Sequence, residues 1–243
     1  SGRSRWARDP SSSSTRFIPC PCSLPSFGRF AKAWTPRFRT GLATCLLLSS
    51  VYLGWTLVAQ RIVTERADAH LAQAGIAHER VLATPLPFST VVWRAIALDG
   101  VRYHNLYLPI MAPGEAPVIH SHPSGANLAG CLSRIEAAAT LAAFTKGIYS
   151  LELLRDTLVV SDLRMGLTPN YVFRFAVAEL RDGTYREIAP RRVKGPRQAD
   201  GDLDWLLATL AGSAIPRPAE AAILTVSGEV AGEETLEQAP KAC

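Results

Sequence analysis

The longest uncharged stretch of the chain runs from Thr40 to Gln60, is dominated by apolar side chains, and has arginines on both flanks. In a helix, about 20 apolar residues cross the ~30 Å hydrocarbon core of a bilayer. The hydroxyl groups within the stretch can hydrogen-bond back onto the helix. We therefore expect a transmembrane helix here. Two alternatives are a helix buried in a protein core and a signal peptide, whose apolar region is shorter and is followed directly by a cleavage site.

Downstream of this stretch, the apolar positions first keep a helical period and then alternate. They recur every three or four residues from Arg61 to Gly75, which predicts that the membrane helix continues as a stalk. Residues 89–98 and 101–108 are rich in β-branched and aromatic side chains. Because Asp99-Gly100 joins these two runs, we expect a β-hairpin, with Trp93 packed in a core or interface.

The remaining pattern predicts more hairpins and two helices. Strand pairs are expected at residues 149–163 and 171–188, helices at 132–146 and 202–210, and a Pro/Gly-rich loop at 109–130. The predicted fold class is therefore α+β: a transmembrane helix continuing into a stalk, then an antiparallel sheet built from hairpins with one or two helices.

This organisation divides the 243 residues into four parts. Residues 1–36, rich in serine and proline, predict a disordered or mistranslated segment, and a chain that starts with Ser1 rather than Met is expected to be processed or a fragment. Residues 37–78 form the predicted transmembrane helix and stalk, 79–213 the extramembrane α+β domain, and 214–243 a loose C-terminal tail. Cys131 stands alone in the folded part, which predicts no disulfide there.

The charge distribution bears on partners and on orientation. Residues 1–40 carry eight Lys/Arg and one acid, so this segment has a net charge of +7 and leaves −2 for the rest of the total of +5. The folded part therefore has no basic surplus for nucleic acid, and the expected partner is the lipid bilayer. Positive charge before the span favours a cytoplasmic N-terminus and an extramembrane domain on the periplasmic side.

His120-Ser121-His122 is a candidate metal-binding pair. In an extended chain, positions i and i+2 project from one face, so both imidazoles could reach the same ion. A metal site needs at least one further ligand, which the spacing does not select. The alternative interpretation is a polar loop, so no metal ligand is assigned on this pattern alone.

Asp162 and Arg164 form a second candidate site, within Ser161-Asp162-Leu163-Arg164-Met165-Gly166. Their side chains could hold a polar group of a substrate, since a guanidinium offers a planar fork of donors. The favoured alternative is an ion pair at a strand end, either between these two residues or with Arg174.

Several motifs together resemble one bacterial inner-membrane family, the membrane-bound metal-dependent hydrolases, whose activity is largely inferred. They are P-L-P-F-S-T-V-V-W-R at 85–94, D-G-V-R-Y at 99–103, F-T-K-G-I-Y-S-L at 144–151, L-V-V-S-D-L-R-M-G at 158–166 and Y-V-F-R-F-A-V-A-E at 171–179. The most specific parts are the proline-led W-R strand and the S-D-L-R-M-G block. The resemblance covers roughly residues 38–190.

The resemblance implies that this chain is the C-terminal part of such a protein, with its last membrane helix and its extramembrane domain. It also implies a divalent metal in the intact protein, held near the N-terminus by a His-Arg-x-x-Thr-His type of motif. This chain has no histidine before His70, so that site cannot be assigned here and the catalytic residues stay unknown. Two functions are therefore carried forward: the membrane-anchored part of a hydrolase, and a non-catalytic single-pass membrane binding or assembly module.

Overall fold

The computed structural model describes residues 36–87, 89–111, 116–195 and 200–223. Almost all of the predicted N-terminal segment, residues 1–36, and most of the predicted tail, residues 214–243, therefore lie outside the described residues. The described residues from Tyr52 onward belong to one compact unit.

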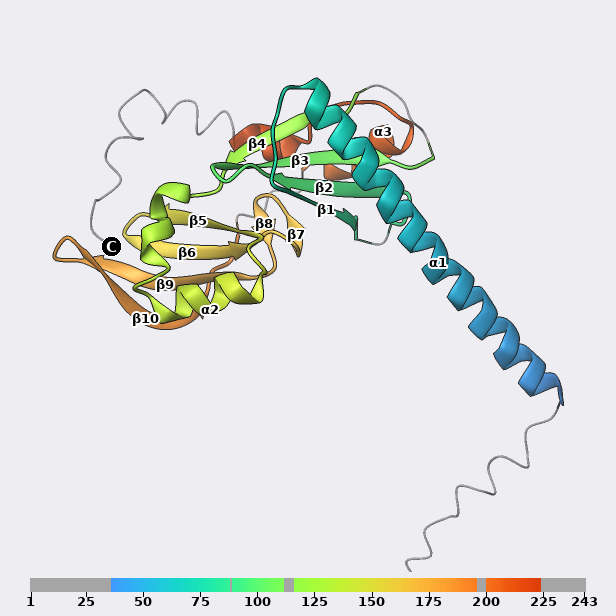
Figure 1. The fold of residues 1–243 in the computed structure, drawn as a ribbon, viewed down its shortest axis with the longest axis horizontal. Helices are drawn as coiled ribbons and strands as arrows, with labels where there is room; N and C mark the ends of the chain where they lie inside the picture. The colour runs from blue at the N-terminus through green and yellow to red at the C-terminus, as the bar shows by residue number, and fades with distance from the viewer. Residues whose placement is uncertain (1–35, 88, 112–115, 196–199, 224–243) are drawn as a thin grey trace, which may run out of the picture. The chain divides into compact units, whose positions relative to one another are not determined.

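Helix α1 (Pro36–Gln73) contains the predicted span and stalk as one continuous element (Figure 1). Its segment from Phe38 is long and apolar enough to cross a membrane, and only 6% of its most apolar window is buried. The hydroxyls of Thr44 and Ser50 donate hydrogen bonds to the carbonyl oxygens of Thr40 and Leu46, at 3.0 and 2.9 Å. The chain thus has one candidate membrane span among its described residues, and this span is not a buried core helix.

The second half of α1 packs against protein instead of facing outward. Ala59, Val63, Ala67 and Leu71 are fully buried and recur every four residues, so they form one stripe along the helix. The helix ends as predicted: Gly75 has a φ of 69°, and the Ile76 N–H donates to the Leu71 carbonyl at 2.9 Å. The stalk is therefore part of the domain core.

The first sheet, sheet A, is an antiparallel meander of four strands in the order β1-β2-β3-β4. The strands are β1 (Arg80–Pro85), β2 (Val92–Leu98), β3 (Arg102–Pro109) and β4 (Ile119–Pro123). Strands β2 and β3 confirm the predicted hairpin around Asp99-Gly100. The prediction of a loop over 109–130 is wrong at β4, because this short strand is formed by pairing with the edge of β3 and not by its own propensity.

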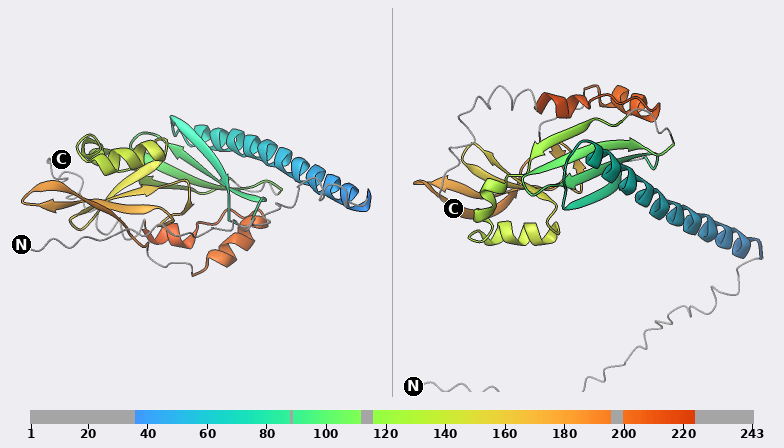
Figure 2. Two further views of the ribbon diagram at one scale, coloured as in Figure 1. Left: turned by 90° about the horizontal axis from the view of Figure 1, so that it is seen from below. Right: turned by 45° about the horizontal axis from the view of Figure 1, so that its top comes forward.

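Alternation along these strands gives sheet A two buried faces. Trp93 and Ala95 of β2 and Leu106 of β3 pack against the buried stripe of α1. Val92 and Tyr107 face the other way and pack with Trp205 of helix α3 (Asp202–Leu210). Figure 2 shows α3 and the C-terminal half of α1 on opposite sides of the sheet. Trp93 thus has the predicted core position.

Sheet B has the strand order β10-β9-β6-β5. Its strands β5 (Tyr149–Leu154), β6 (Thr157–Asp162), β9 (Arg174–Arg181) and β10 (Thr184–Arg192) confirm two more predicted hairpins, and β7 (Gly166–Leu167) with β8 (Asn170–Tyr171) forms a small separate one. The predicted helix 132–146 is shortened to α2 (Glu136–Phe144), and a 3-10 helix, η2 (Ala126–Cys131), precedes it. Cys131 is disulfide-bonded, which contradicts the prediction of no disulfide in the folded part. That prediction rests on Cys131 being the only cysteine within the folded part.

The two sheets meet where the residues that follow β4 lie beside β5. The Leu151 N–H donates to the Ser124 carbonyl at 2.9 Å. Gly125 next to it has a φ of 77°, and a side chain at this position would lie 2.1 Å from the Leu151 oxygen, so only glycine fits. Ile96 and Tyr103 of sheet A share a core with Leu163 and Tyr171 at this junction.

We predict that Leu71→Ala lowers the free energy of unfolding by about 2–5 kcal/mol, because it leaves a cavity between α1 and sheet A. Tryptophan fluorescence of the full chain in detergent, followed through denaturant unfolding, measures the effect. The control is Glu65→Ala, which removes only an exposed ion pair on the same helix and should cost less than about 1 kcal/mol. Equal losses in both variants would show that α1 does not belong to the core.

Candidate functional site

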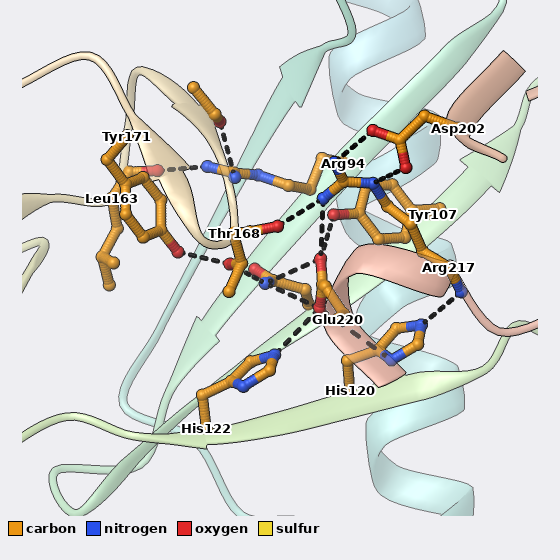
Figure 3. A network of polar contacts seen from close by, with 12 residues as sticks. Arg94, Tyr107, His120, His122, Leu163, Thr168, Tyr171, Asp202, Arg217 and Glu220 are labelled. Carbon is orange, nitrogen blue, oxygen red and sulfur yellow. Dashed lines mark hydrogen bonds and ion pairs between the residues drawn. The ribbon is translucent and has the colours of Figure 1, made fainter. Parts of the chain in front are cut away.

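A buried carboxylate, Glu220, lies at the centre of a polar cluster on the α3 side of sheet A (Figure 3). Residues 218–223 are helical and carry this side chain against strands β3 and β4. The His122 Nε2 donates to a Glu220 oxygen at 2.9 Å, and Asn105 Nδ2 donates to the same oxygen at 3.2 Å. The Tyr107 hydroxyl donates to the other oxygen. The carboxylate thus accepts hydrogen bonds from the inner strand β3 and from the edge strand β4.

The predicted histidine pair takes part in this cluster. His120 and His122 are two residues apart on β4 and face the same side of sheet A as Asn105 and Tyr103, their partners in register. The His120 Nε2 accepts a hydrogen bond from the backbone N–H of Arg217 at 3.4 Å, while its Nδ1 lies 3.9 Å from Glu220. An accepting Nε2 requires the neutral ring with its proton on Nδ1. Both imidazoles are therefore engaged by the protein itself.

The metal-binding interpretation of His120 and His122 stays a prediction. Within the described ranges, no group of three or more His, Cys, Asp or Glu side chains is placed to hold a metal ion. Burial lowers the pKa of His120, although the charge of Glu220 acts in the opposite direction. The neutral state of His120 and its contact with Arg217 fit a structural role on the sheet.

Arg217 connects the cluster to two other elements. Its guanidinium is 2% exposed and forms a bidentate pair with Asp202 at the start of α3, with distances of 2.6 and 3.1 Å. The remaining Nη1 donates to the Thr168 carbonyl at 2.6 Å and lies 3.6 Å from Glu220. A buried cation between two carboxylates keeps the local charge nearly balanced, which a dry interior requires.

The electrostatics of the cluster favour an ionised Glu220. Burial by itself would raise the pKa of this carboxyl, but the hydrogen bonds from His122 and from the hydroxyl of Tyr107 act against it, and the pKa lies below its ordinary value. Burial, together with the negative charge of Glu220, raises the pKa of Tyr107 well above its ordinary value. Tyr107 therefore stays a neutral donor to a charged acceptor.

Arg94 of β2 joins sheet A to the turn that follows β6. Its side chain is 1% exposed and donates to the carbonyl oxygen of Leu163 and, at 2.8 Å, to that of Gly166. Asn105 donates to the hydroxyl of Thr168 at 2.9 Å in the same region. The loop around β7 and β8 is thus held against the sheet by polar contacts.

A cavity of about 460 Å³ opens beside the Glu220 cluster, between the two sheets. His122 and Thr168 belong to both, so the cluster forms part of the cavity wall. The full lining comprises Tyr103, His122, Pro123, Ser150, Leu151, Glu152, Leu154, Ser161, Thr168, Pro169, Tyr171, Arg174 and Ile223. A volume of this size is typical of small-molecule sites.

The second predicted pair, Asp162 and Arg164, forms the expected ion pair at the end of β6. The Arg164 Nη2 and Nε lie 2.7 and 3.0 Å from the two Asp162 oxygens, and the guanidinium lies 5.2 Å from the ring centre of Phe144. Arg174 pairs with Glu152 instead. The lining of the 460 Å³ cavity includes neither Asp162 nor Arg164, but Asp162 lines a separate hollow of about 330 Å³ with Phe144 and Phe175, and a role of the pair toward a substrate stays a prediction.

Sequence reasoning missed the residues that organise the site. The sequence places Arg217 and Glu220 in the predicted tail. It indicates only a strand position for Asn105 and Tyr107, with no role in a site. One local signal existed: Pro218 favours the first turn of a helix, and the charges of Arg217 and Glu220 stand three residues apart. Their partners in β4 and α3 are too distant along the chain for any such pattern to reveal.

No family model, no curated protein and no solved structure matches this chain. The class of protein is therefore defined by its own fold and site: an apolar helix of membrane-crossing length that continues into an α+β domain. The domain holds a buried carboxylate cluster beside a cavity. The resemblance to the metal-dependent hydrolases stays a prediction.

We predict that Glu220→Gln lowers the free energy of unfolding by about 3 kcal/mol at pH 7, because it leaves Arg217 and the surrounding donors without their anion. The folded-state pKa of Glu220 is depressed. Its stabilisation is therefore fully present above the unfolded pKa of about 4.3 and is lost as the pH falls through the folded pKa. Denaturant unfolding from pH 7 to pH 3 should show the difference between the two proteins shrinking.

The matched control is Glu136→Gln, which removes an exposed carboxylate from α2. It should change stability by less than about 0.5 kcal/mol at pH 7. A Glu220→Gln variant as stable as wild type at neutral pH would contradict a structural role for the cluster.

Proposed function

We propose that this chain is a single-pass, membrane-anchored binding module of the bacterial inner membrane. The observation that carries the proposal is the continuity of α1. One helix presents exposed leucines such as Leu46 and Leu53 in its first half, and it buries Val63 and Leu71 against sheet A in its second. One continuous helix therefore supplies both the candidate span and part of the domain core.

The charge pattern supports a periplasmic location for the domain. Arg29, Lys32, Arg37 and Arg39 precede the span, while Arg61 and Arg66 follow it. Positive charge is retained on the cytoplasmic side of membranes, so this bias favours a cytoplasmic N-terminus.

Two features of the site support binding over catalysis. The Glu220 carboxylate is bonded to His122, Asn105 and Tyr107, which suits a rigid scaffold more than a reacting centre, although the Asn105 Oδ1 has no partner among the described residues. The cavity next to them offers polar groups on an otherwise apolar wall, as small-molecule sites do.

A second candidate function is the C-terminal part of a metal-dependent hydrolase, and one contact favours it. The two most specific motifs of the resemblance, the W-R strand and the S-D-L-R-M-G block, touch each other through Arg94 and the carbonyls of Leu163 and Gly166. In such a protein, the domain would cover or regulate a membrane-embedded metal site supplied by other residues, where the ion would activate water.

We predict that the full chain stays in bacterial membranes after alkaline carbonate extraction and that a C-terminal tag is cleaved by protease added outside spheroplasts. The double variant Leu47→Arg/Val51→Arg should move into the soluble or degraded fraction, since each charge costs about 2.5–3.5 kcal/mol at a span centre. Gln73→Arg, which adds a charge at the exposed end of α1, is the control and should stay anchored. Release of the wild type by carbonate would refute the anchor.

We also predict that the detergent-purified chain carries no near-stoichiometric zinc or manganese, in wild type and in His120→Ala/His122→Ala alike. The reason is that both imidazoles already bond within the protein. Plasma mass spectrometry measures the metal content. Stoichiometric metal in the wild type that disappears in the double variant would favour the hydrolase and a metal site at this pair.

A further inference from the structure

Arg174 of β9 indicates which class of ligand the cavity between the sheets could bind. Its side chain is 6% exposed and pairs with Glu152 through Nη2. Its Nε is buried and has no hydrogen-bond partner among the described residues. A buried donor left unpaired is destabilising, so the structure leaves one side of this guanidinium in need of an acceptor.

A second unpaired polar atom lies beside it. Ser161 of β6 is the register partner of Arg174, and its hydroxyl oxygen is also buried without a partner among the described residues. Ser150 of β5 is in turn the register partner of Ser161. All three side chains line the cavity, so they form a row of donors across three neighbouring strands.

The chemistry of this row selects an oxyanion. A guanidinium carries N–H groups in a planar fork that matches carboxylate and phosphate oxygens, and a serine hydroxyl can add another donor. The opposite wall supplies Tyr103 and Tyr171, which burial keeps protonated by raising the pKa of both phenols. These two phenols therefore add no negative charge at the cavity surface, and the ionised Glu220 is bonded to His122 and Tyr107 within the cluster.

Glu152 is placed to act as an exchangeable partner of Arg174. Its side chain is 38% exposed, whereas that of Arg174 is 6% exposed. The carboxylate can therefore turn out to solvent, while the guanidinium stays fixed in the wall.

We propose that this cavity binds a small organic anion whose carboxylate or phosphate group contacts Arg174 and Ser161 and displaces Glu152. The carbon part of the ligand would lie against Tyr103, Leu151 and Tyr171. The inference rests on the proposed binding function and names its ligand class, but it does not depend on the membrane anchor.

The test is titration of the full chain in detergent with sodium phosphate and, separately, sodium benzoate, against sodium chloride at equal ionic strength. Isothermal calorimetry and the thermal unfolding midpoint report binding. We expect one or both anions to bind and to raise the midpoint; phosphate alone would indicate a phosphate-bearing ligand, and benzoate alone a carboxylate on a ring. Failure of both in the wild type and in Glu152→Gln would overturn the proposal.

Two variants and one control distinguish anion binding at this site from a general effect of the protein's net charge. Glu152→Gln removes the competing carboxylate and should tighten anion binding roughly tenfold, whereas Glu136→Gln makes the same charge change on α2 and should not. Arg174→Lys keeps the charge but loses the fork and should weaken binding roughly tenfold, in a variant whose folding is checked by circular dichroism. An equal change in anion affinity in Glu152→Gln and Glu136→Gln would show that only the net charge of the protein matters, which would contradict a specific site. Loss of anchoring appears in the carbonate extraction alone, so a failed anchor and a failed ligand site give different results.

Discussion

The arrangement of the C-terminal segment on sheet A depends on one buried anion. A carboxylate removed from water is costly unless charged and hydrogen-bonded partners surround it. Glu220 obtains them from His122 on β4 and from Tyr107 on β3, and Arg217 links it to Asp202 at the start of α3. The cost of leaving this carboxylate unpaired is what orders the C-terminal segment against the sheet.

This constraint also shapes the cavity. His122 and Thr168 touch the cluster on one side and line the cavity on the other, so the wall on the side of sheet A is held rigid. The wall on the side of sheet B carries Arg174, whose bonding is incomplete. An incompletely bonded guanidinium in a cavity wall is a feature expected of a preformed binding site, because a ligand could complete its bonding.

Local patterns predicted much of the fold. The hairpin at Asp99-Gly100 and helix α3 follow from turn residues and apolar spacing that lie within a few residues of each other. Strands β1 and β4 were not foreseen as strands, since each is short, bounded by proline, and formed by pairing with a neighbouring strand. The ion pair of Asp162 and Arg164 could be predicted because its two members are two residues apart.

The sequence by itself determined the apolar helix, its continuation as a stalk, the hairpins and the proximity of His120 to His122, because periodicity and near-neighbour spacing encode them. Only the tertiary structure decided what those histidines do. His122 contacts Glu220 across 98 residues of sequence, and Asn105 contacts it across 115. Contacts over such separations depend on the packing of whole elements, which no local pattern contains.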